Sequence, residues 1–234
     1  MRSNFDPAIF GEAFHLFVEK EVGLFGSSLA PIFHILTLIV LLLSFIYGNK
    51  TRKVFTIYFA ANWLFLFGYW GGYAISYWME IGAIYLVSFV MAPILLFMIL
   101  YFWIVEVIEP KFELDFKSLP WWRYLVGIVI LWGFWYPGYN YGEGFIFSAK
   151  DFIYSNYGLM PCPTTMVVLG IMTSTYPKGN RMLYSLLTAY ALVIGTATVI
   201  ASWLPDIPMI LLGVYALILI IRNHIQQKNN LIKS

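Results

Sequence analysis

The chain has 234 residues, of which 61% are hydrophobic and only 11% are charged, and its mean hydropathy is +0.77. A soluble domain carries about a quarter of its residues as charges, so the composition predicts an integral membrane protein. A single cysteine excludes an intrachain disulfide, and 20% aromatic content excludes disorder. A net charge of +2 without a long basic run argues against nucleic-acid binding.

Apolar segments of about 20 residues are needed to cross a hydrocarbon core roughly 30 Å thick. Some candidates here are shorter, at about 15 to 17 residues, and fit a locally thinned bilayer. We predict an all-α integral membrane helix bundle with about seven transmembrane helices. The predicted spans are Leu29–Tyr47, Val54–Ser76, Ile81–Val107, Trp122–Tyr136, Gly158–Ser174, Leu183–Trp203 and Ile207–Ile221.

Residues 1–28 precede the first span and form a predicted external segment. Phe10, Phe14, Phe17 and Val18 recur at helical spacing, which predicts an amphipathic helix over Ala8–Val22. This helix either lies on the outer membrane interface or packs against the bundle. The transmembrane domain is expected over residues 29–222, and a cytoplasmic tail over 223–234.

Lysine and arginine are divided unequally between the two sets of predicted loops. Eleven of the fourteen lie on the side of the loops after the first, third, fifth and seventh spans, with Arg123 at the start of the fourth span counted among them, and three lie on the other side. Cytoplasmic loops carry the excess of these residues. The N-terminus is therefore expected outside and the C-terminus in the cytoplasm.

His34 lies about five residues into the first span, where it is a candidate axial ligand for haem. Haem held between helices usually takes two histidines. The other two, His15 and His224, fall before the first span and after the last. The sequence favours the alternative, in which His34 is hydrogen-bonded to a neighbouring helix.

Asn62 lies near the middle of the second span, where its amide must find a hydrogen-bonding partner. A helix–helix contact is favoured over a substrate contact. Gly68 and Gly72 form a G-x-x-x-G pair in the same span, and Ala191 and Gly195 form a similar pair in the sixth. Such pairs predict close helix packing, within this chain or against another.

Aromatic residues are concentrated in the outer half of the predicted bundle. An interfacial belt explains many of them, although their density exceeds what a belt requires. They could instead line a pocket or present a surface to a partner. The residues that we consider for such a ligand or partner surface are Trp70, Tyr73, Tyr77, Trp78, Trp135 and Tyr136.

Two prolines bracket Cys162, where the long external loop meets the fifth span. They fix a helix start near Pro163, a position that favours a thiolate. A soft, copper-like metal could bind there with Met160 or Met166 as a second ligand. Since there is no second cysteine, a rigid bend at the helix start is favoured, and no cofactor is predicted.

The predicted spans lack charged side chains at their centres and lack activated nucleophiles. No span centre holds Asp, Glu, Lys or Arg, which proton- or sodium-coupled transport usually needs. No serine or threonine has a histidine or lysine placed to activate it. Glu106 is expected to reach water at the cytoplasmic end of the third span, and Asp206 to break the chain after the sixth.

The element around Cys162 is similar to one in a family of prokaryotic polytopic membrane proteins of unknown function. In that family a glycine precedes a short Pro-Cys-Pro-Thr element, and an apolar helix follows. The matching residues here are Gly158, Pro161, Cys162, Pro163, Thr164, Leu169, Gly170 and Ile171. The resemblance implies a multi-pass protein of a prokaryotic cytoplasmic membrane, and it supplies no activity and no catalytic residues.

These features favour a non-catalytic integral subunit of a larger membrane protein complex. Its expected partners are membrane lipid and other membrane subunits. The alternative is a carrier or pore for a small neutral molecule or a soft metal ion. An enzyme acting on lipid would need an activating base, and the sequence does not indicate one.

Overall fold

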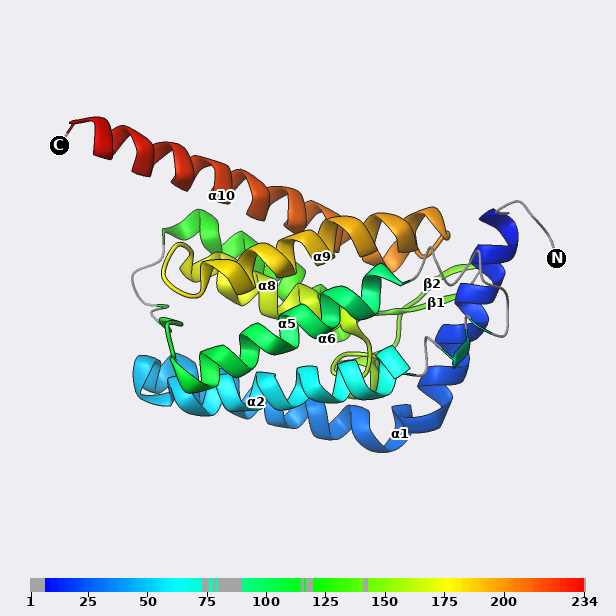
Figure 1. Ribbon diagram of the computed structural model, residues 1–234. Helices are drawn as coiled ribbons and strands as arrows, with labels where there is room; N and C mark the ends of the chain where they lie inside the picture. The colour runs from blue at the N-terminus through cyan, green and yellow to red at the C-terminus, as the bar shows by residue number, and fades with distance from the viewer. Residues whose placement is uncertain are drawn as a thin grey trace.

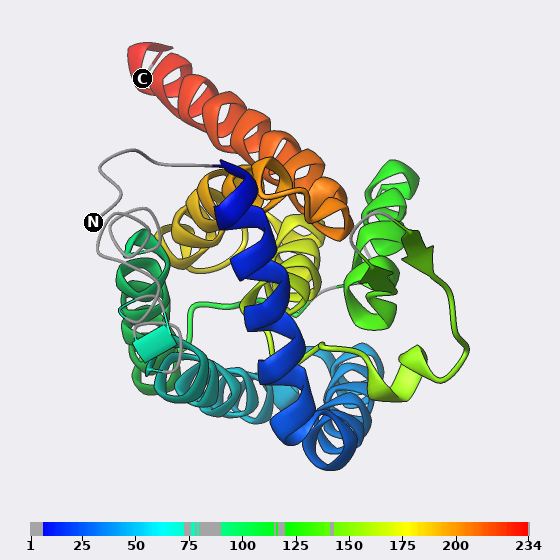
Figure 2. The ribbon, with the colours of Figure 1, turned by 90° about the vertical axis from the view of Figure 1, so that its right-hand side faces the viewer.

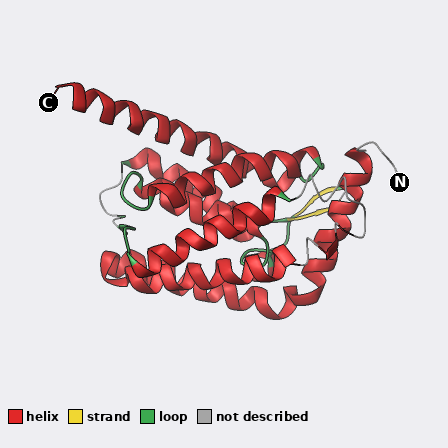
Figure 3. Ribbon diagram, viewed as in Figure 1, coloured by secondary structure: helices red, strands yellow, loops and turns green. Residues whose placement is uncertain are grey.

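The computed structural model describes residues 7–72, 76–77, 79, 90–114, 116, 120–140 and 143–233. These residues form a mostly helical structure, and the sheet they contain has two strands (Figure 3). The helical class predicted from the sequence is therefore confirmed.

The long helices run back and forth between two ends of the molecule (Figure 1). We call one the hairpin end, because it carries strands β1, Gly138–Asn140, and β2, Gly144–Ile146. The other is the basic end, formed by the 3₁₀ turn Gly48–Thr51 and residues 109–114, 116 and 176–180. The connecting helices are α1 (Pro7–Tyr47), α2 (Arg52–Phe65), α5 (Met91–Ile108), α6 (Val126–Trp135), α8 (Pro161–Thr175), α9 (Arg181–Ile200) and α10 (Ile207–Lys233).

Irregular turns extend several of these helices. A π-helical turn, Leu66–Gly71, continues α2 towards the hairpin end. The 3₁₀ turns Trp121–Leu125 and Leu204–Asp206 lead into α6 and α10. The short helix α7, Asp151–Tyr154, follows the hairpin.

Four helices among the described residues are long and apolar enough to cross a membrane: Ser28–Gly71, Met91–Ile108, Arg181–Ile200 and Leu204–Asn230. The first has 44 residues and includes the turn Gly48–Thr51, after which α2 returns beside α1 (Figure 1). Arg123–Trp135 is a shorter apolar helix. Many large apolar side chains on these helices are exposed, and such a surface is unusual for a protein in water.

Residues 7–47 form one continuous helix, α1, which includes the described part of the predicted N-terminal segment. The first half of α1 crosses the hairpin end of the bundle (Figure 2). Phe17 is fully buried there, with its ring centroid 5.6 Å from that of Trp70 and 5.3 Å from that of Tyr77. The Tyr77 hydroxyl donates to the Ala13 carbonyl at 2.9 Å. Of the two placements that the sequence leaves open for this helix, the structure has the one in which the helix packs against the bundle.

Helix α8 lies inside the bundle (Figure 2), and all 15 of its residues are buried. Pro161 and Pro163 fall in its first turn, where backbone N–H groups have no partner within the helix. The Thr164 hydroxyl accepts from the Gly158 N–H at 3.0 Å and donates to the Met160 carbonyl at 2.8 Å. Because other helices surround it, α8 does not need the continuous apolar surface of a helix that faces lipid.

Glycines bring α6 and α8 unusually close together. A Cβ atom added to Gly170 would lie 2.4 Å from Cγ1 of Ile130, and one added to Gly133 would lie 2.6 Å from Cβ of Met166. Both contacts are far shorter than van der Waals separations, so each position requires glycine. The small-residue pairs found in the sequence did not include these two.

The predicted small-residue pairs have different surroundings. Ala191 and Gly195 are buried on α9, and a Cβ added to Gly213 of α10 would lie 3.2 Å from Cβ of Ala191. A Cβ added to Gly68 or Gly72 would meet no described atom within 4 Å. The described part of the chain therefore does not pack closely against this G-x-x-x-G pair.

Two segments expected to be a loop and a tail have regular structure. The described part of the loop that was predicted to be external folds into the antiparallel hairpin, in which Tyr139 pairs with Phe145, and then into α7. Helix α10 continues to Lys233, so most of the predicted tail over 223–234 extends the last helix.

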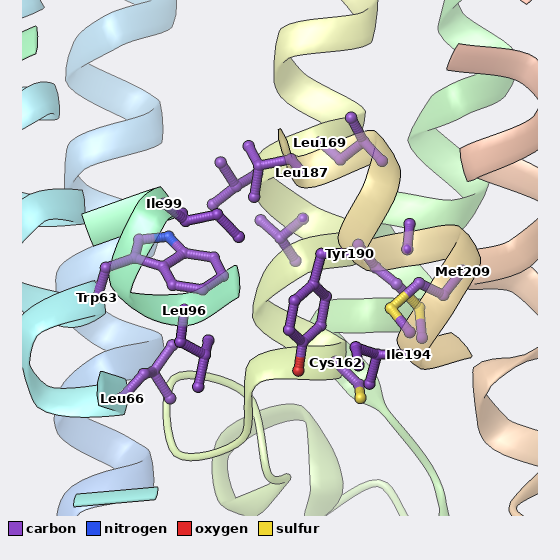
Figure 4. Close-up of a cluster of buried hydrophobic side chains, with 14 of the residues drawn as sticks. Trp63, Leu66, Leu96, Ile99, Cys162, Leu169, Leu187, Tyr190, Ile194 and Met209 are labelled. Carbon is purple, nitrogen blue, oxygen red and sulfur yellow. The ribbon is translucent and has the colours of Figure 1, made fainter. Parts of the chain in front are cut away.

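The core joins side chains from helices far apart in the sequence (Figure 4). The Trp63 ring of α2 lies 6.5 Å from the Tyr190 ring of α9, measured between centroids. Figure 4 shows Cys162 of α8 beside Ile194 of α9 in the same cluster. The start of α8 is thus fixed against α9.

Candidate functional site

A pocket of about 700 Å³ opens at the hairpin end. Its walls come from the first half of α1, from residues 136–140 at the end of α6 and in β1, from Glu143, from residues 151 and 154–156, and from Trp203. Of its described lining residues, none is lysine or arginine. Carboxylates and aromatic rings favour a positively charged group. Those that line the pocket belong to Glu19, Glu143, Asp151, Tyr136, Tyr139, Tyr154 and Trp203.

Tyr136 and Trp203 are the most buried aromatic residues in this lining. Tyr136 ends α6 with a left-handed backbone, φ 34° and ψ 80°, which is rare for a bulky residue. The indole N–H of Trp203 donates to the Tyr136 hydroxyl at 2.6 Å. That hydroxyl donates in turn to Oδ1 of Asp206 at 2.7 Å.

Asp206 is completely buried behind these two rings. Its Oδ2 accepts a hydrogen bond of 2.6 Å from the Thr198 hydroxyl, and the Cys162 thiol also donates to the carboxyl. Donors from the end of α6, from α8 and from α9 therefore converge on one carboxyl. Buried acids persist only where hydrogen bonds replace water, so Asp206 ties these three helices together directly behind the pocket.

His15 of α1 packs against the aromatic wall of the pocket. Its ring centroid lies 5.0 Å from that of Trp203 and 5.9 Å from that of Tyr139. Burial lowers the pKa of His15 below its ordinary value of 6.5, because a charged ring loses hydration there. The ring is therefore neutral at pH 7.

His34 and Ser155 meet, although the sequence offered no reason to pair them. His34 Nε2 lies 3.0 Å from Ser155 Oγ and 3.1 Å from the Phe134 carbonyl oxygen, and its Nδ1 lies 2.7 Å from the Ala30 carbonyl oxygen. Ser155 also lines the pocket, so a nucleophile and a base are within reach of each other.

The hydrogen bonds around Ser155 indicate a structural role for this pair. The Ser155 hydroxyl donates to the Phe134 carbonyl at 2.9 Å and accepts from the Tyr157 N–H at 3.3 Å. The Phe134 carbonyl oxygen therefore competes with His34 Nε2 for the single Ser155 proton. The group connects α1, the end of α6 and the chain before α8, which fits the sequence's favoured interpretation of His34 as hydrogen-bonded.

The proposed metal ligands take part in separate interactions. Cys162 donates to Asp206, and His34 is bonded to the groups around Ser155. Met160 and Met166 are buried at the start of α8. The described residues contain no group of three or more His, Cys, Asp or Glu side chains that could hold a metal ion.

The predicted aromatic surface divides into separate environments. Trp70 and Tyr77 are buried under the first half of α1. The Trp135 indole N–H donates to the Ser148 carbonyl at 3.0 Å, and Tyr136 belongs to the pocket. Tyr73 and Trp78 lie outside the described residues. Asn62 donates to the Gly158 carbonyl at 3.0 Å, and this contact is with the chain before α8.

Glu106, at the basic end, is buried rather than in water. Its Oε1 accepts from the backbone N–H groups of Lys111, at 2.6 Å, and Phe112, and its Oε2 accepts from the Asn180 amide at 3.1 Å. Asn180 also caps α9 by accepting from the Leu183 N–H at 3.0 Å. The carboxylate thus fixes the turn after α5 to the start of α9.

Sequence reasoning missed the role of Asp206, which was expected only to break the chain. One signal was present: Asp206 is the single charged residue in a long apolar stretch, and prolines stand at positions 205 and 208. An isolated acid in such surroundings points to burial with specific partners. Two of those partners, Tyr136 and Cys162, come from distant segments, and the sequence alone does not identify them.

The comparisons with known proteins give one match, to the Family of unknown function (DUF6064), over residues 22–231. No curated protein and no solved structure matches the chain. The match spans most of the sequence, and the chain therefore belongs to the Family of unknown function (DUF6064).

Proposed function

We propose that this protein is a non-catalytic integral subunit of a larger membrane protein complex, and that its pocket at the hairpin end receives a positively charged segment of a partner subunit. The observation that carries the proposal is the pocket lining: three carboxylates and several aromatic rings, with no lysine or arginine among the described lining residues. Carboxylates and aromatic rings both attract a guanidinium or ammonium group.

The proposed membrane placement follows the seven predicted spans, with the later part of α1 and helices α2, α5, α6, α8, α9 and α10 crossing a prokaryotic cytoplasmic membrane. The distribution of charge supports it, because Lys50, Arg52, Lys53, Lys111 and Lys178 lie at the basic end. The positive-inside rule then puts this end and the C-terminus in the cytoplasm. Alkaline phosphatase fused to the C-terminus should be inactive, and an active fusion would contradict this orientation.

The alternative function, a carrier or pore, has less support. Helix α8 occupies the interior of the bundle, where a transport path would have to open, and all of its residues are buried. Its close contacts with α6 at Gly133 and Gly170 leave little room for it to move. A transport path that opened between α6 and α8 would have to break these contacts.

The proposal is tested by copurification of the tagged protein from native membranes. Glu19→Lys places a positive charge in the pocket and should release the partner. Glu12→Lys makes the same charge change on the same helix, at an exposed residue outside the pocket lining, and should retain it. Equal retention by both variants, with the fold intact, would reject the pocket as the binding site.

A further inference from the structure

A second pocket, of about 230 Å³, opens at the basic end. It lies between α10 and the segments that enter α6 and leave α8, and it is lined by Arg123, Arg222, Tyr176, Asn223 and Gln226, with Pro177 and Leu219. None of these described lining residues is an acid. Two guanidinium groups and two side-chain amides therefore share one recess.

The two arginines reach the recess from distant parts of the chain. Arg123, in the 3₁₀ turn before α6, is oriented by a hydrogen bond of 2.8 Å from its Nη1 to the Ser174 carbonyl. Arg222 is exposed on α10. Both side chains line the same recess, so their positive charges converge on one region. The Asn223 amide donates to the Tyr176 hydroxyl at 3.3 Å, which links α10 to the end of α8.

We propose that this recess binds the phosphate group of an anionic membrane phospholipid. Guanidinium groups bind phosphate oxygens through paired, charge-assisted hydrogen bonds. Basic pockets between helices at the cytoplasmic side of a membrane bind such headgroups.

The surroundings of the recess favour a lipid over free phosphate. Leu219 lies in the lining, and Ile218 and Ile221 are exposed on the same part of α10. These side chains offer an apolar surface for an acyl chain beside the headgroup. The inference rests on the membrane placement proposed above, and it is independent of the pocket at the hairpin end.

Native mass spectrometry of the full-length protein in mild detergent, titrated with phosphatidylglycerol, tests this inference. Wild type should bind one lipid saturably, and Arg222→Gln should weaken that binding about tenfold or more. Arg222→Lys should restore it only in part, because a lysine cannot make the paired contacts. Lys228→Gln removes an equal charge from an exposed site on α10 outside the recess, and it should bind as wild type does.

Three results would overturn the inference. An equal loss in Arg222→Gln and Lys228→Gln would show that only net charge matters. Equal binding of phosphatidylcholine would remove the need for an anionic lipid. Displacement of the lipid by millimolar inorganic phosphate would assign the recess to free phosphate. Any of these, found while the partner still copurifies, would leave the proposed subunit role standing.

Discussion

Tyr136 donates its phenolic hydrogen to Asp206 across 2.7 Å while its own backbone holds a left-handed conformation, φ 34°. Such a conformation costs on the order of 1–3 kcal/mol for a bulky residue and persists only where its surroundings enforce it. The hydrogen bond is part of that enforcement. It joins a residue that lines the pocket to a carboxyl that also bonds α8 and α9, so the shape of the pocket depends on how these helices pack.

Removing the Tyr136 hydroxyl should destabilise the protein. Tyr136→Phe leaves Oδ1 of Asp206 and the indole N–H of Trp203 without their shared partner. A buried polar group that loses its partner costs about 1–3 kcal/mol. Thermal unfolding in detergent measures this cost, with Tyr154→Phe at an exposed tyrosine as the control. Equal midpoints for both variants would mean that the bond adds nothing.

Alanine at Gly170 should disrupt the packing of α6 on α8. The new methyl group would lie 2.4 Å from Ile130, and overpacking of this kind costs about 1–3 kcal/mol. Gly68→Ala is the matched control. It meets no described atom within 4 Å, and replacing a helical glycine gains about 0.5–1 kcal/mol. Unfolding midpoints should therefore move in opposite directions, and a loss in Gly68→Ala as large as that in Gly170→Ala would contradict the packing described.

The same Gly68→Ala variant separates two kinds of helix packing. If Gly68 and Gly72 receive a helix of a partner subunit, the variant should still show the raised unfolding midpoint but lose part of its complex in mild detergent. If the variant retains the whole complex, Gly68 and Gly72 do not contact the partner, and the pocket is then the only proposed contact.

His15 should make stability depend on pH. Its pKa is lowered by burial in the folded protein and is near 6.5 when unfolded, so acid protonates the unfolded chain first. The contribution of the neutral His15 to the free energy of unfolding is fully present above pH 6.5, and it is lost as the pH falls below that value. Midpoints measured between pH 7.5 and 5.5 should fall more for wild type than for His15→Gln, and parallel curves would show that His15 plays no part.

Ser155 should not behave as a catalytic nucleophile. The Phe134 carbonyl competes with His34 for the hydroxyl proton, and the oxygen also accepts from the Tyr157 N–H, so a fluorophosphonate probe should not label the folded protein. His34→Ala should lower the unfolding midpoint, because it removes hydrogen bonds between α1 and the chain beside Ser155. Labelling that is lost in both Ser155→Ala and His34→Ala would instead identify an enzyme.

Cys162 should be unreactive in the folded protein. Its side chain is buried and its thiol donates to Asp206, so a membrane-permeant maleimide should modify it only after denaturation. Copper(I) at equimolar ratio should bind Cys162→Ala as weakly as it binds wild type. Rapid labelling, or copper binding that depends on Cys162, would revive the soft-metal alternative.

Apolar runs in the sequence placed several helices well. The predicted span Ile207–Ile221 begins where α10 begins, and Leu183–Trp203 overlaps most of α9. Hydropathy shows that a segment avoids water, but it does not show whether the segment faces lipid or protein. A helix surrounded by protein, such as α8, can be short and rich in threonine. Four helices are long and apolar enough to be recognised as spans from length and composition.

The pocket could not be predicted in the same way. It forms because the first half of α1 folds over the hairpin end, which brings His15 beside Trp203. Cys162 and Asp206 are far apart in the sequence, and neither lies in a pattern that indicates the other. The concentration of aromatic residues was a real signal, but it did not separate those under α1, such as Trp70, from those lining the pocket.

The central claim is that this protein works as a subunit, and the mass and composition of the complex released from native membranes by a mild detergent test it most directly. We predict comigration with other membrane subunits in a fixed ratio. A monomer, or an oligomer of this chain alone, would contradict the account.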